Sequence, residues 1–240
     1  MLITNRKRQD KIPSVMNEKA GSMVLGIYGA HGLAQEVNLI AKKINAIQKR
    51  WSEIVYIDDI NDIAEIHGRK VYKFEELLQC CREDGLEIVI AVGEPSVREL
   101  LYQKVLEKEV KPVSLIHPGV YIDETTSIGK GVVICEGATI TSNVAIGDNT
   151  YIQPHAVIGH DIQIGRHTVI GSNCQIGGAD IIGDRVFMGF LSGTTDHICV
   201  GNDVIISAGA IVFRDLPDGV VAVGNPARVM KKNGERKVFK

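Results

Sequence analysis

The chain has 240 residues, 45% of them hydrophobic, and a formal net charge of −2 at pH 7. Its length suffices for two domains. The charge, with no basic stripe outside the chain ends, argues against a general nucleic-acid binder, and no apolar run is long enough to span a membrane. The five cysteines are scattered, as in a reducing compartment, and not arranged as a disulfide framework. We therefore expect a cytoplasmic protein without membrane insertion.

Residues 1–22 are polar and basic and lack the apolar core of a signal peptide, so we expect a flexible N-terminal lead. Residues 23–113 then alternate between two kinds of pattern. Buried strands are predicted at 23–28, 51–57 and 87–92, and helices at 33–47, 74–81 and 95–108. This alternation predicts a Rossmann-like α/β domain with a parallel sheet and helices on both faces.

Ligands of such sheets bind at the carboxyl ends of the strands. The loop after the first predicted strand runs from Gly29 to Gly32 and contains His31. His31 stands near the place where a dinucleotide fingerprint has a second glycine, and its imidazole would occupy the space of the pyrophosphate. This argues against NAD. A nucleotide in another pose remains open, with its phosphates near the helix start at Leu33.

The other two predicted strands also end in candidate substrate-binding residues. Asp58 and Asp59 follow the second strand, and Gly93 follows the third. The two carboxylates can accept hydrogen bonds from a ribose or a base edge. They can equally form a solvated turn at the end of the strand, and the sequence leaves both interpretations open.

Residues 122–212 carry a six-residue period without interruption. Its first position is aliphatic or Met at every repeat except Thr194, and the next residue is often Gly. The position four residues after the first is usually small or β-branched. This period fits neither a helix nor an alternating strand, and it predicts a hexapeptide-repeat parallel β-helix in which three hexads close one triangular coil. Glycine is expected to turn the chain at the corners.

The flat faces of such a prism carry Tyr151, Val157 and Phe187, with His155 nearby. These side chains suggest that one face packs against sister chains. No loop interrupts the array, so any chemistry of the prism must come from residues on its own coils.

Several segments of residues 23–232 resemble the two-domain bacterial sugar O- and N-acetyltransferases of the sialic-acid O-acetyltransferase (NeuD)/PglD-like family. The matching segments are Ile27-Tyr-Gly-Ala-His-Gly-Leu-Ala-Gln-Glu-Val37, Ile57-Asp-Asp59, Ala91-Val-Gly93, Leu115-Ile-His-Pro118, Val157-Ile-Gly-His-Asp161 and Gly224-Asn-Pro-Ala-Arg228. The resemblance implies a left-handed β-helix over residues 114–217 and a C-terminal tail over 218–240 that closes a CoA site. It also implies homotrimers with acetyl-CoA between neighbouring prisms and a nucleotide-linked sugar on the N-terminal domain.

Within this resemblance, His160 matches the catalytic histidine of the family and Asp161 the acidic residue that follows it. The chemistry agrees with the match. Acetyl transfer from a thioester needs a base that takes a proton from the attacking group, and imidazole has a pKa near neutrality. An adjacent carboxylate can bind the other ring nitrogen and stabilise the imidazolium.

The chain also departs from the family pattern. Gln153 stands where many relatives have an Asn, and Val169 stands where they place a second histidine that contacts acetyl-CoA. His167 lies two positions away from that place and is the nearest candidate for the contact. His31 replaces a glycine of the commoner loop.

The residues that contact CoA are assigned from several weaker signals. Arg228 and Lys231 can meet the CoA phosphates, although a solvated basic tail is the alternative. Backbone amides at Gly178, Ser207 and Ala208 can pair with the pantetheine arm or with the developing oxyanion.

Two other interpretations compete with acetyl transfer. His155 and His160 have the five-residue spacing of two zinc ligands in γ-type carbonic anhydrases, but the third position is Gly119. A catalytic zinc needs three protein ligands, so no metal site is predicted. The other alternative is a non-catalytic nucleotide-sugar-binding module. Our prediction is an acetyl-CoA-dependent transferase that N-acetylates a nucleotide-linked amino sugar, with O-acetylation of sialic acid or a related sugar as the second choice.

Overall fold

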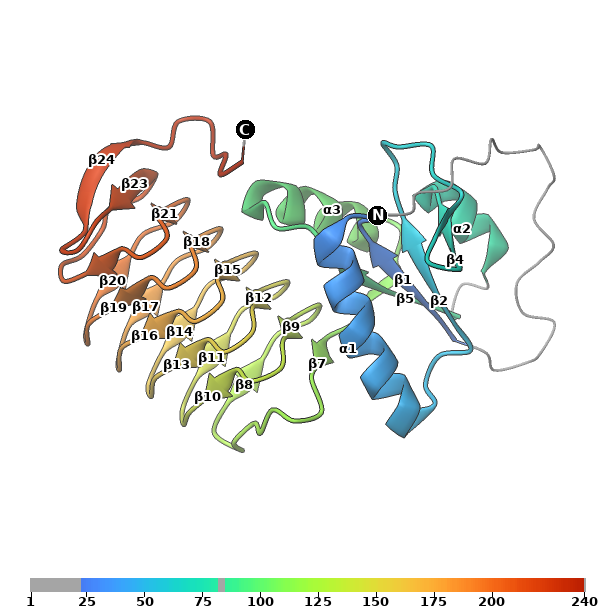
Figure 1. The fold of residues 1–240 in the computed structure, drawn as a ribbon, viewed down its shortest axis with the longest axis horizontal. Coiled ribbons are helices and arrows are strands. Elements are labelled where there is room, and N and C mark those ends of the chain that lie inside the picture. The colour runs from blue at the N-terminus through green and yellow to red at the C-terminus, as the bar shows by residue number, and fades with distance from the viewer. Residues whose placement is uncertain (1–22, 82–84, 240) are drawn as a thin grey trace. The chain divides into compact units, whose positions relative to one another are not determined.

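The computed structural model describes residues 23–81 and 85–239, and the predicted lead at residues 1–22 lies outside them. The chain divides into two compact units (Figure 1). The first comprises the described chain up to Val92 with Leu101–Val113, and the second comprises Gly93–Leu100 with the chain from Ser114. The segment Gly93–Leu100 thus clusters with the β-helix, although the sequence placed it in the α/β domain.

The first unit contains a six-stranded sheet in the order β3-β4-β2-β1-β5-β6. Its strands are β1 Val24–Tyr28, β2 Glu53–Ile57, β3 Glu65–Ile66, β4 Arg69–Tyr72, β5 Leu86–Ile90 and β6 Lys111–Pro112; the helices are α1 Gly32–Gln48, α2 Phe74–Cys80 and α3 Pro95–Glu107, which both units share. All neighbouring strands are parallel except the hairpin of β3 and β4. The predicted parallel α/β sheet is therefore confirmed. Within the described residues, none of these helices combines the length and hydropathy that crossing a bilayer requires.

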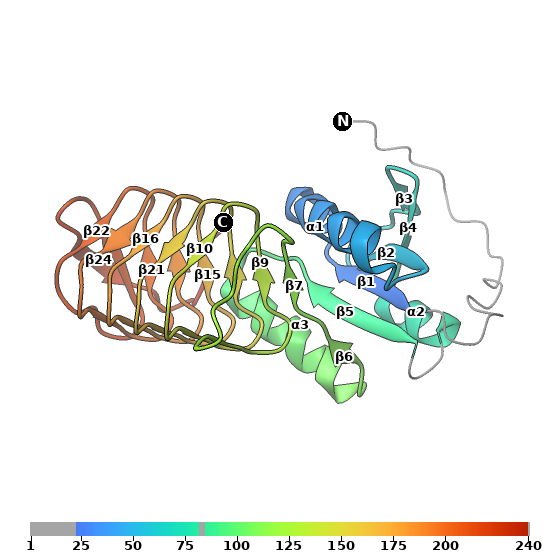
Figure 2. The same ribbon diagram turned by 90° about the horizontal axis from the view of Figure 1, so that it is seen from below.

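The second unit is a parallel β-helix, as the period predicted, and it is left-handed, as the family resemblance implied. Its two-residue strands are β7 Leu115–Ile116, β8 Ser127–Ile128, β9 Val133–Ile134, β10 Thr139–Ile140, β11 Ala145–Ile146, β12 Tyr151–Ile152, β13 Val157–Ile158, β14 Gln163–Ile164, β15 Val169–Ile170, β16 Gln175–Ile176, β17 Ile181–Ile182, β18 Phe187–Met188, β19 Gly193–Thr194, β20 Cys199–Val200, β21 Ile205–Ile206 and β22 Ile211–Val212, followed by β23 Val220–Val223 and β24 Arg228–Lys232. Residues 18 apart pair in register, as Tyr151 does with Val169. Figure 2 shows the resulting coils stacked one behind another.

Three sheets form the faces of the prism. We call them the β8 sheet (β8, β11, β14, β17, β20), the β10 sheet (β10, β13, β16, β19, β22) and the β9 sheet, which runs from β7 and β9 through β12, β15, β18 and β21 to β23 and β24. The second residue of each two-residue strand, most often isoleucine, and the residue four positions later point to the core, as Ile158 and Ile162 do with no exposed surface. Burying these two columns at about 25 cal/mol per Å² of apolar surface stabilises each coil against its neighbours.

The glycine that follows each isoleucine has another role than the one predicted. None of these glycines has a positive φ. A Cβ at Gly165 would lie 2.4 Å from the carbonyl carbon of Gly183 on the next coil, and one at Gly171 would lie 2.5 Å from the Met188 oxygen. Glycine is needed here because successive coils approach too closely for a side chain.

The corners themselves turn at the residue three positions after the isoleucine. There φ is positive: it is 69°, 74° and 69° at Gly131, Gly137 and Gly209, where glycine turns the corner as predicted, and it lies between 55° and 62° at Asn143, Asn149, His155, Asp161, His167, Asn173, Ala179, Arg185, Leu191, His197 and Asp203. Asn and Asp enter this left-handed region at low cost, which explains why they recur at this place.

The face with Tyr151 and Phe187 belongs to the β9 sheet and is covered by the chain's own residues. The Arg98 guanidinium lies 5.6 Å from the centre of the Tyr151 ring, and Tyr151 has no exposed surface. The Phe239 ring packs edge-on against Phe187 at 5.4 Å. The expectation that these two side chains face sister chains is therefore wrong.

Candidate functional site

The hexad phase places His160 and Asp161 at the corner that follows the β10 sheet, directly after β13. We call this the His160 corner. Both side chains are more than half exposed in the single chain, at 66% for His160 and 53% for Asp161. The side chain of His160 therefore points out of the prism.

The Nδ1 atom of His160 lies 2.8 Å from Oδ2 of Asp161. Hydrogen bonds, first from Asn143 and then from His160, hold the pKa of Asp161 below its ordinary value. An ionised carboxylate only accepts hydrogen bonds, so the proton of the neutral imidazole is assigned to Nδ1. The lone pair of Nε2 is then free, and a general base at this corner would act through Nε2.

Gly178 lies one coil beyond His160 and keeps space for its ring. A Cβ at Gly178 would be 2.8 Å from both Cε1 and Nε2 of His160. No positive φ requires glycine at this position. The glycine therefore leaves the Nε2 edge of the imidazole open.

The amide of Gly178 is already engaged. It donates to Oδ1 of Asp196 at 2.8 Å, and the neighbouring amide of Ala179 donates to the carbonyl oxygen of His160 at 2.8 Å. The prediction that the Gly178 amide binds pantetheine or the oxyanion is therefore wrong, because its hydrogen is used within the prism.

Ser207 and Ala208 lie at a different corner, the one that follows the β9 sheet. The Ser207 amide donates to the carbonyl oxygen of Ala222 at 2.9 Å and is not free for a ligand. Ala208 is exposed, and no hydrogen bond of its amide occurs among residues 23–81 and 85–239. Of these two positions, only Ala208 stays a candidate for a backbone contact with pantetheine.

Arg228 and Lys231 lie on β24, every residue of which is exposed. The Arg228 guanidinium donates to the carbonyl oxygen of Ala227 at 3.0 Å, which leaves further donors for an anion. The assignment of these two side chains to the CoA phosphates stays a prediction.

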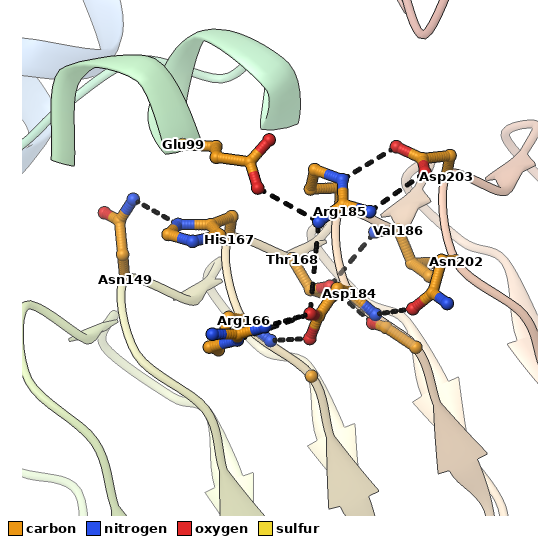
Figure 3. A network of polar contacts seen from close by, with 12 residues as sticks. Glu99, Asn149, Arg166, His167, Thr168, Asp184, Arg185, Val186, Asn202 and Asp203 are labelled. Atoms are coloured by element: carbon orange, nitrogen blue, oxygen red, sulfur yellow. Dashed lines mark hydrogen bonds and ion pairs between the residues drawn. The ribbon is translucent and has the colours of Figure 1, made fainter. Parts of the chain in front are cut away.

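His167 lies in a different environment from the one predicted. It is 3% exposed, and its Nδ1 atom lies 2.9 Å from Nδ2 of Asn149 (Figure 3). The Asn149 carbonyl oxygen accepts from Arg98 at 2.6 Å and 3.0 Å. Burial is the main reason why the pKa of His167 falls to about 4, so the ring is neutral near pH 7. This placement does not support a contact with acetyl-CoA, because the ring is enclosed and holds Asn149 in place.

In the first unit, Asp58 closes the loop that follows β2. Its Oδ1 accepts the amides of Ile60 and Asn61, each at 2.9 Å, and its Oδ2 accepts the Asn61 side chain at 3.0 Å. Burial by itself raises the pKa of Asp58, but these hydrogen bonds outweigh it, and the pKa lies below its ordinary value. The carboxylate is ionised and is used mainly to shape the loop.

Asp59 is also held by its neighbours. It accepts a short hydrogen bond from the Tyr28 hydroxyl, pairs with Lys104 at 2.6 Å and accepts the Phe74 amide at 2.8 Å. Its interpretation as a freely solvated turn is therefore wrong. A ribose or a base that used this carboxylate would have to compete with Lys104.

The Gly29–Gly32 loop and the Asp58 loop come together through His31. Nε2 of His31 lies 3.3 Å from Nδ2 of Asn61, and His31 and Gly32 are exposed. Gly29 has φ +134°, and a Cβ there would lie 2.6 Å from the Ala91 oxygen, so only glycine fits. Asn61 was not predicted from the sequence. Its position three residues after Asp58, within a turn, is the signal that was available.

Comparisons with known proteins match both units. Residues 24–105 match the PglD N-terminal domain family, and residues 143–178 match the bacterial transferase hexapeptide family. The chain is similar to perosamine N-acetyltransferase from Caulobacter crescentus, solved with CoA and GDP-perosamine, with 28% identity, 89% of this chain and 99% of that chain covered, and a TM-score of 0.79. It is also similar to the acetyltransferase domain of PglB from Neisseria gonorrhoeae, solved with acetyl coenzyme A, with 26% identity, 88% and 100% covered, and a TM-score of 0.80.

Among curated sequences, serine acetyltransferase from Helicobacter pylori is 45% identical over 49 residues, which is 20% of this chain and 29% of that enzyme. The chain spans less than a third of the length of the curated relatives that it matches. The similarity over both units therefore comes from the solved structures.

Proposed function

We propose, from its membership of the PglD/NeuD-like family of two-domain sugar acetyltransferases, that this protein transfers acetyl from acetyl-CoA to the amino group of a nucleotide-linked amino sugar. The observation that carries the proposal is the His160–Asp161 pair, with Nδ1 bound to the carboxylate and Nε2 left open by Gly178. This is the arrangement that a general base for acyl transfer needs.

In the proposed reaction, the sugar nitrogen attacks the thioester carbonyl carbon while Nε2 of His160 takes a proton from that nitrogen. A C–N bond forms and the C–S bond breaks. The imidazolium returns its proton to the departing thiolate, so the products are the N-acetyl sugar and CoA. Asp161 stabilises the transient imidazolium through its hydrogen bond to Nδ1.

Acetyl-CoA contacts both the His160 corner and the Ala208 corner in this proposal. The two corners follow different sheets of one prism. We propose a homotrimer in which CoA lies between two copies of the chain and meets one corner on each of them. Arg228 and Lys231 are the proposed partners of the CoA phosphates.

The nucleotide is proposed to bind at the carboxyl edge of β1 and β2. The exposed His31 and Asn61, the glycine backbone at Gly29 and Gly32, and the uncapped start of α1 are the groups that support this. Gly93, which follows β5 by three residues, is kept as a proposed backbone contact. All five cysteines are free thiols, which suits a protein that works in the cytoplasm.

A thiol-release assay tests the proposal. Acetyl-CoA is offered with UDP- and GDP-linked amino sugars, with free sialic acid and with the matching unaminated nucleotide sugars as controls. CoA release that requires the amino group supports N-acetylation. CoA release with sialic acid alone would indicate O-acetylation instead. No CoA release with any acceptor, together with tight binding of a nucleotide sugar, would favour a non-catalytic binding module.

A further inference from the structure

The carboxylate of Asp161 has a second partner besides His160. The side-chain amide of Asn143 donates a short hydrogen bond to Oδ1 of Asp161, while Oδ2 faces Nδ1 of His160 at 2.8 Å. Asn143 and Asp161 are 18 residues apart, so they occupy the same corner on successive coils. Their φ angles are 56° and 60°.

The backbone of Asn143 is fixed from the coil before it. Its amide donates to Oγ1 of Thr125 at 2.7 Å. Thr125 in turn donates from its amide to Oδ1 of Asp123 at 3.0 Å. A chain of hydrogen bonds therefore runs along one edge of the prism and ends on the imidazole of His160.

The left-handed conformation alone does not explain the orientation of Asn143. Asn149 and Asn173 occupy the equivalent place at the other two corners, with φ of 56° and 58°. The side chain of Asn149 is directed to Arg98 and His167, and no contact between Asn173 and a carboxylate occurs in the described part of the chain. Only Asn143 is aimed at the carboxylate that holds the histidine.

We propose that Asn143 is a positioning residue of the active site, which fixes the Asp161 carboxylate so that Oδ2 selects the Nδ1–H tautomer of His160. A carboxylate held at one oxygen cannot rotate away from the imidazole. Free imidazole in water favours the opposite tautomer, with hydrogen on Nε2, which has no lone pair to act as a base there. The catalytic importance of this effect rests on the proposed function, whereas the tautomer itself does not.

The test compares Asn143→Gly and Asn143→Asp with a matched control, Asn173→Gly. Glycine adopts the left-handed backbone without strain, so the fold is preserved while the Asn143 side chain and its hydrogen bond to Asp161 are removed. The imidazole nitrogens of His160 are observed by 15N NMR, with the His160→Ala variant used to assign them, and kcat and KM are measured separately.

The wild-type protein and Asn173→Gly are expected to hold His160 in the Nδ1–H form. Asn143→Gly is expected to shift the population towards Nε2–H and to lower kcat about tenfold with little change in KM. Asn143→Asp, which places an acceptor against Oδ1, should not restore the rate. An unchanged tautomer in Asn143→Gly would overturn the proposal. A wild-type protein with no turnover but with a tautomer that depends on Asn143 would support the positioning role and count against the proposed function.

Discussion

At the level of single residues, the removal of the His160 imidazole is the direct test of the base. His160→Ala should lower kcat by at least about a hundredfold, because the attacking amine then loses its proton to water alone. Acetyl-CoA affinity should stay close to normal, since the proposed phosphate contacts of Arg228 and Lys231 and the proposed backbone contact at Ala208 are all kept. Steady-state kinetics measures the change in kcat, and a calorimetric titration with CoA measures the affinity. Unchanged turnover would show that His160 is not the base.

Gly177 and Gly178 are adjacent, yet they should respond differently to the same substitution. A Cβ at Gly177 would lie 2.6 Å from the carbonyl carbon of Thr195, and backbone cannot give way. The three atoms nearest to a Cβ at Gly178 all belong to the ring of His160, which can turn away. Gly177→Ala should therefore lower the melting temperature, whereas Gly178→Ala should leave it nearly unchanged and lower kcat about tenfold or more.

Thermal unfolding and turnover of both variants check this prediction, with Gly234→Ala as the control. A Cβ at Gly234 would meet no atom within 4 Å. Full activity in Gly178→Ala would mean that His160 can act from another rotamer.

His167 predicts a specific loss of stability in acid. Its pKa is about 4 in the folded protein, below the ordinary 6.5, so the unfolded chain binds the extra proton first. Stability is then complete above about pH 6.5 and decreases as the pH falls towards 4, by up to about 3 kcal/mol. His167→Asn keeps a residue that tolerates the left-handed backbone and should remove this part of the pH dependence.

Urea unfolding between pH 7 and pH 4 measures the effect. Because carboxylates also titrate in this range, the informative quantity is the difference between variant and wild type. His67→Asn is the control, since His67 is an exposed left-handed residue in the β3–β4 turn. The same slope in His167→Asn and wild type would contradict the burial argument.

At the level of elements, the inward polar side chains of the prism follow one rule. Ser114, Thr150 and Thr168 each donate a hydroxyl hydrogen to the carbonyl oxygen fifteen residues later, at 2.8 to 2.9 Å. Asp180 occupies such an inward place with no exposed surface. Its Oδ1 accepts the Ile198 amide at 2.7 Å, but its Oδ2 has no hydrogen bond of normal geometry among the described residues. The Thr194 side chain favours the ionised carboxylate, but burial outweighs this interaction.

Asp180→Thr should therefore stabilise the protein. Burial raises the pKa of Asp180, so the folded state holds a proton more tightly than the unfolded chain does. Stability therefore falls as the pH rises from about 3.8 through that raised pKa. At neutral pH the folded protein is destabilised by the ionisation of this buried carboxyl. Threonine supplies the missing donor without this cost, and a gain of about 1 to 3 kcal/mol at pH 7 is expected.

Chemical denaturation at pH 7 and at pH 4 checks the sign. The advantage of Asp180→Thr should shrink as the pH falls from 7 to 4, because the raised pKa of the buried carboxyl lets the folded wild type take up a proton before the unfolded chain does. Asp180→Asn serves as the isosteric control, because its amide can donate without titration. A loss of stability in both variants would mean that the interior needs the carboxylate itself.

The elements themselves differ in how far the sequence predicts them. The six-residue phase predicts the strands from β8 to β22, because the aliphatic residue of each hexad must reach the core and a slip would expose it. It does not reach β7, β23 or β24, which lie outside residues 122–212, and no strand forms at Ile122. The β3–β4 hairpin was missed, since both strands are short and charged. Its turn at His67 and Gly68, with φ of 47° and 77°, is the signal that was available.

Of the contacts in the candidate site, only the one between neighbouring residues could be predicted from the sequence. His160 and Asp161 are adjacent, so their pairing follows from sequence. Asn143 contacts Asp161 from the preceding coil, 18 residues earlier in the chain. This contact can be predicted only when the length of one coil is known to be 18 residues. The burial of His167 could not be predicted in the same way. It depends on Arg98, which lies far away in the sequence and covers that face of the prism.

At the level of the whole molecule, the proposed reaction requires more than one chain. The His160 corner and the Ala208 corner follow different sheets. In the proposed trimer, one CoA takes the first corner from one copy and the second from its neighbour. Analytical ultracentrifugation should give three times the chain mass of 26.2 kDa.

Mixed oligomers test this arrangement without depending on mass alone. His160→Ala removes the base, and Ala208→Trp should block pantetheine at an exposed corner without disturbing the core. Each variant should be inactive by itself. When equal amounts are unfolded and refolded together, a site is complete only if one chain contributes an intact His160 and its neighbour an intact Ala208. Random assembly then restores about a quarter of the wild-type activity. No recovery, with mixed trimers demonstrated by differential tagging, would place both corners of each active site on one chain, and the shared site between copies would have to be abandoned.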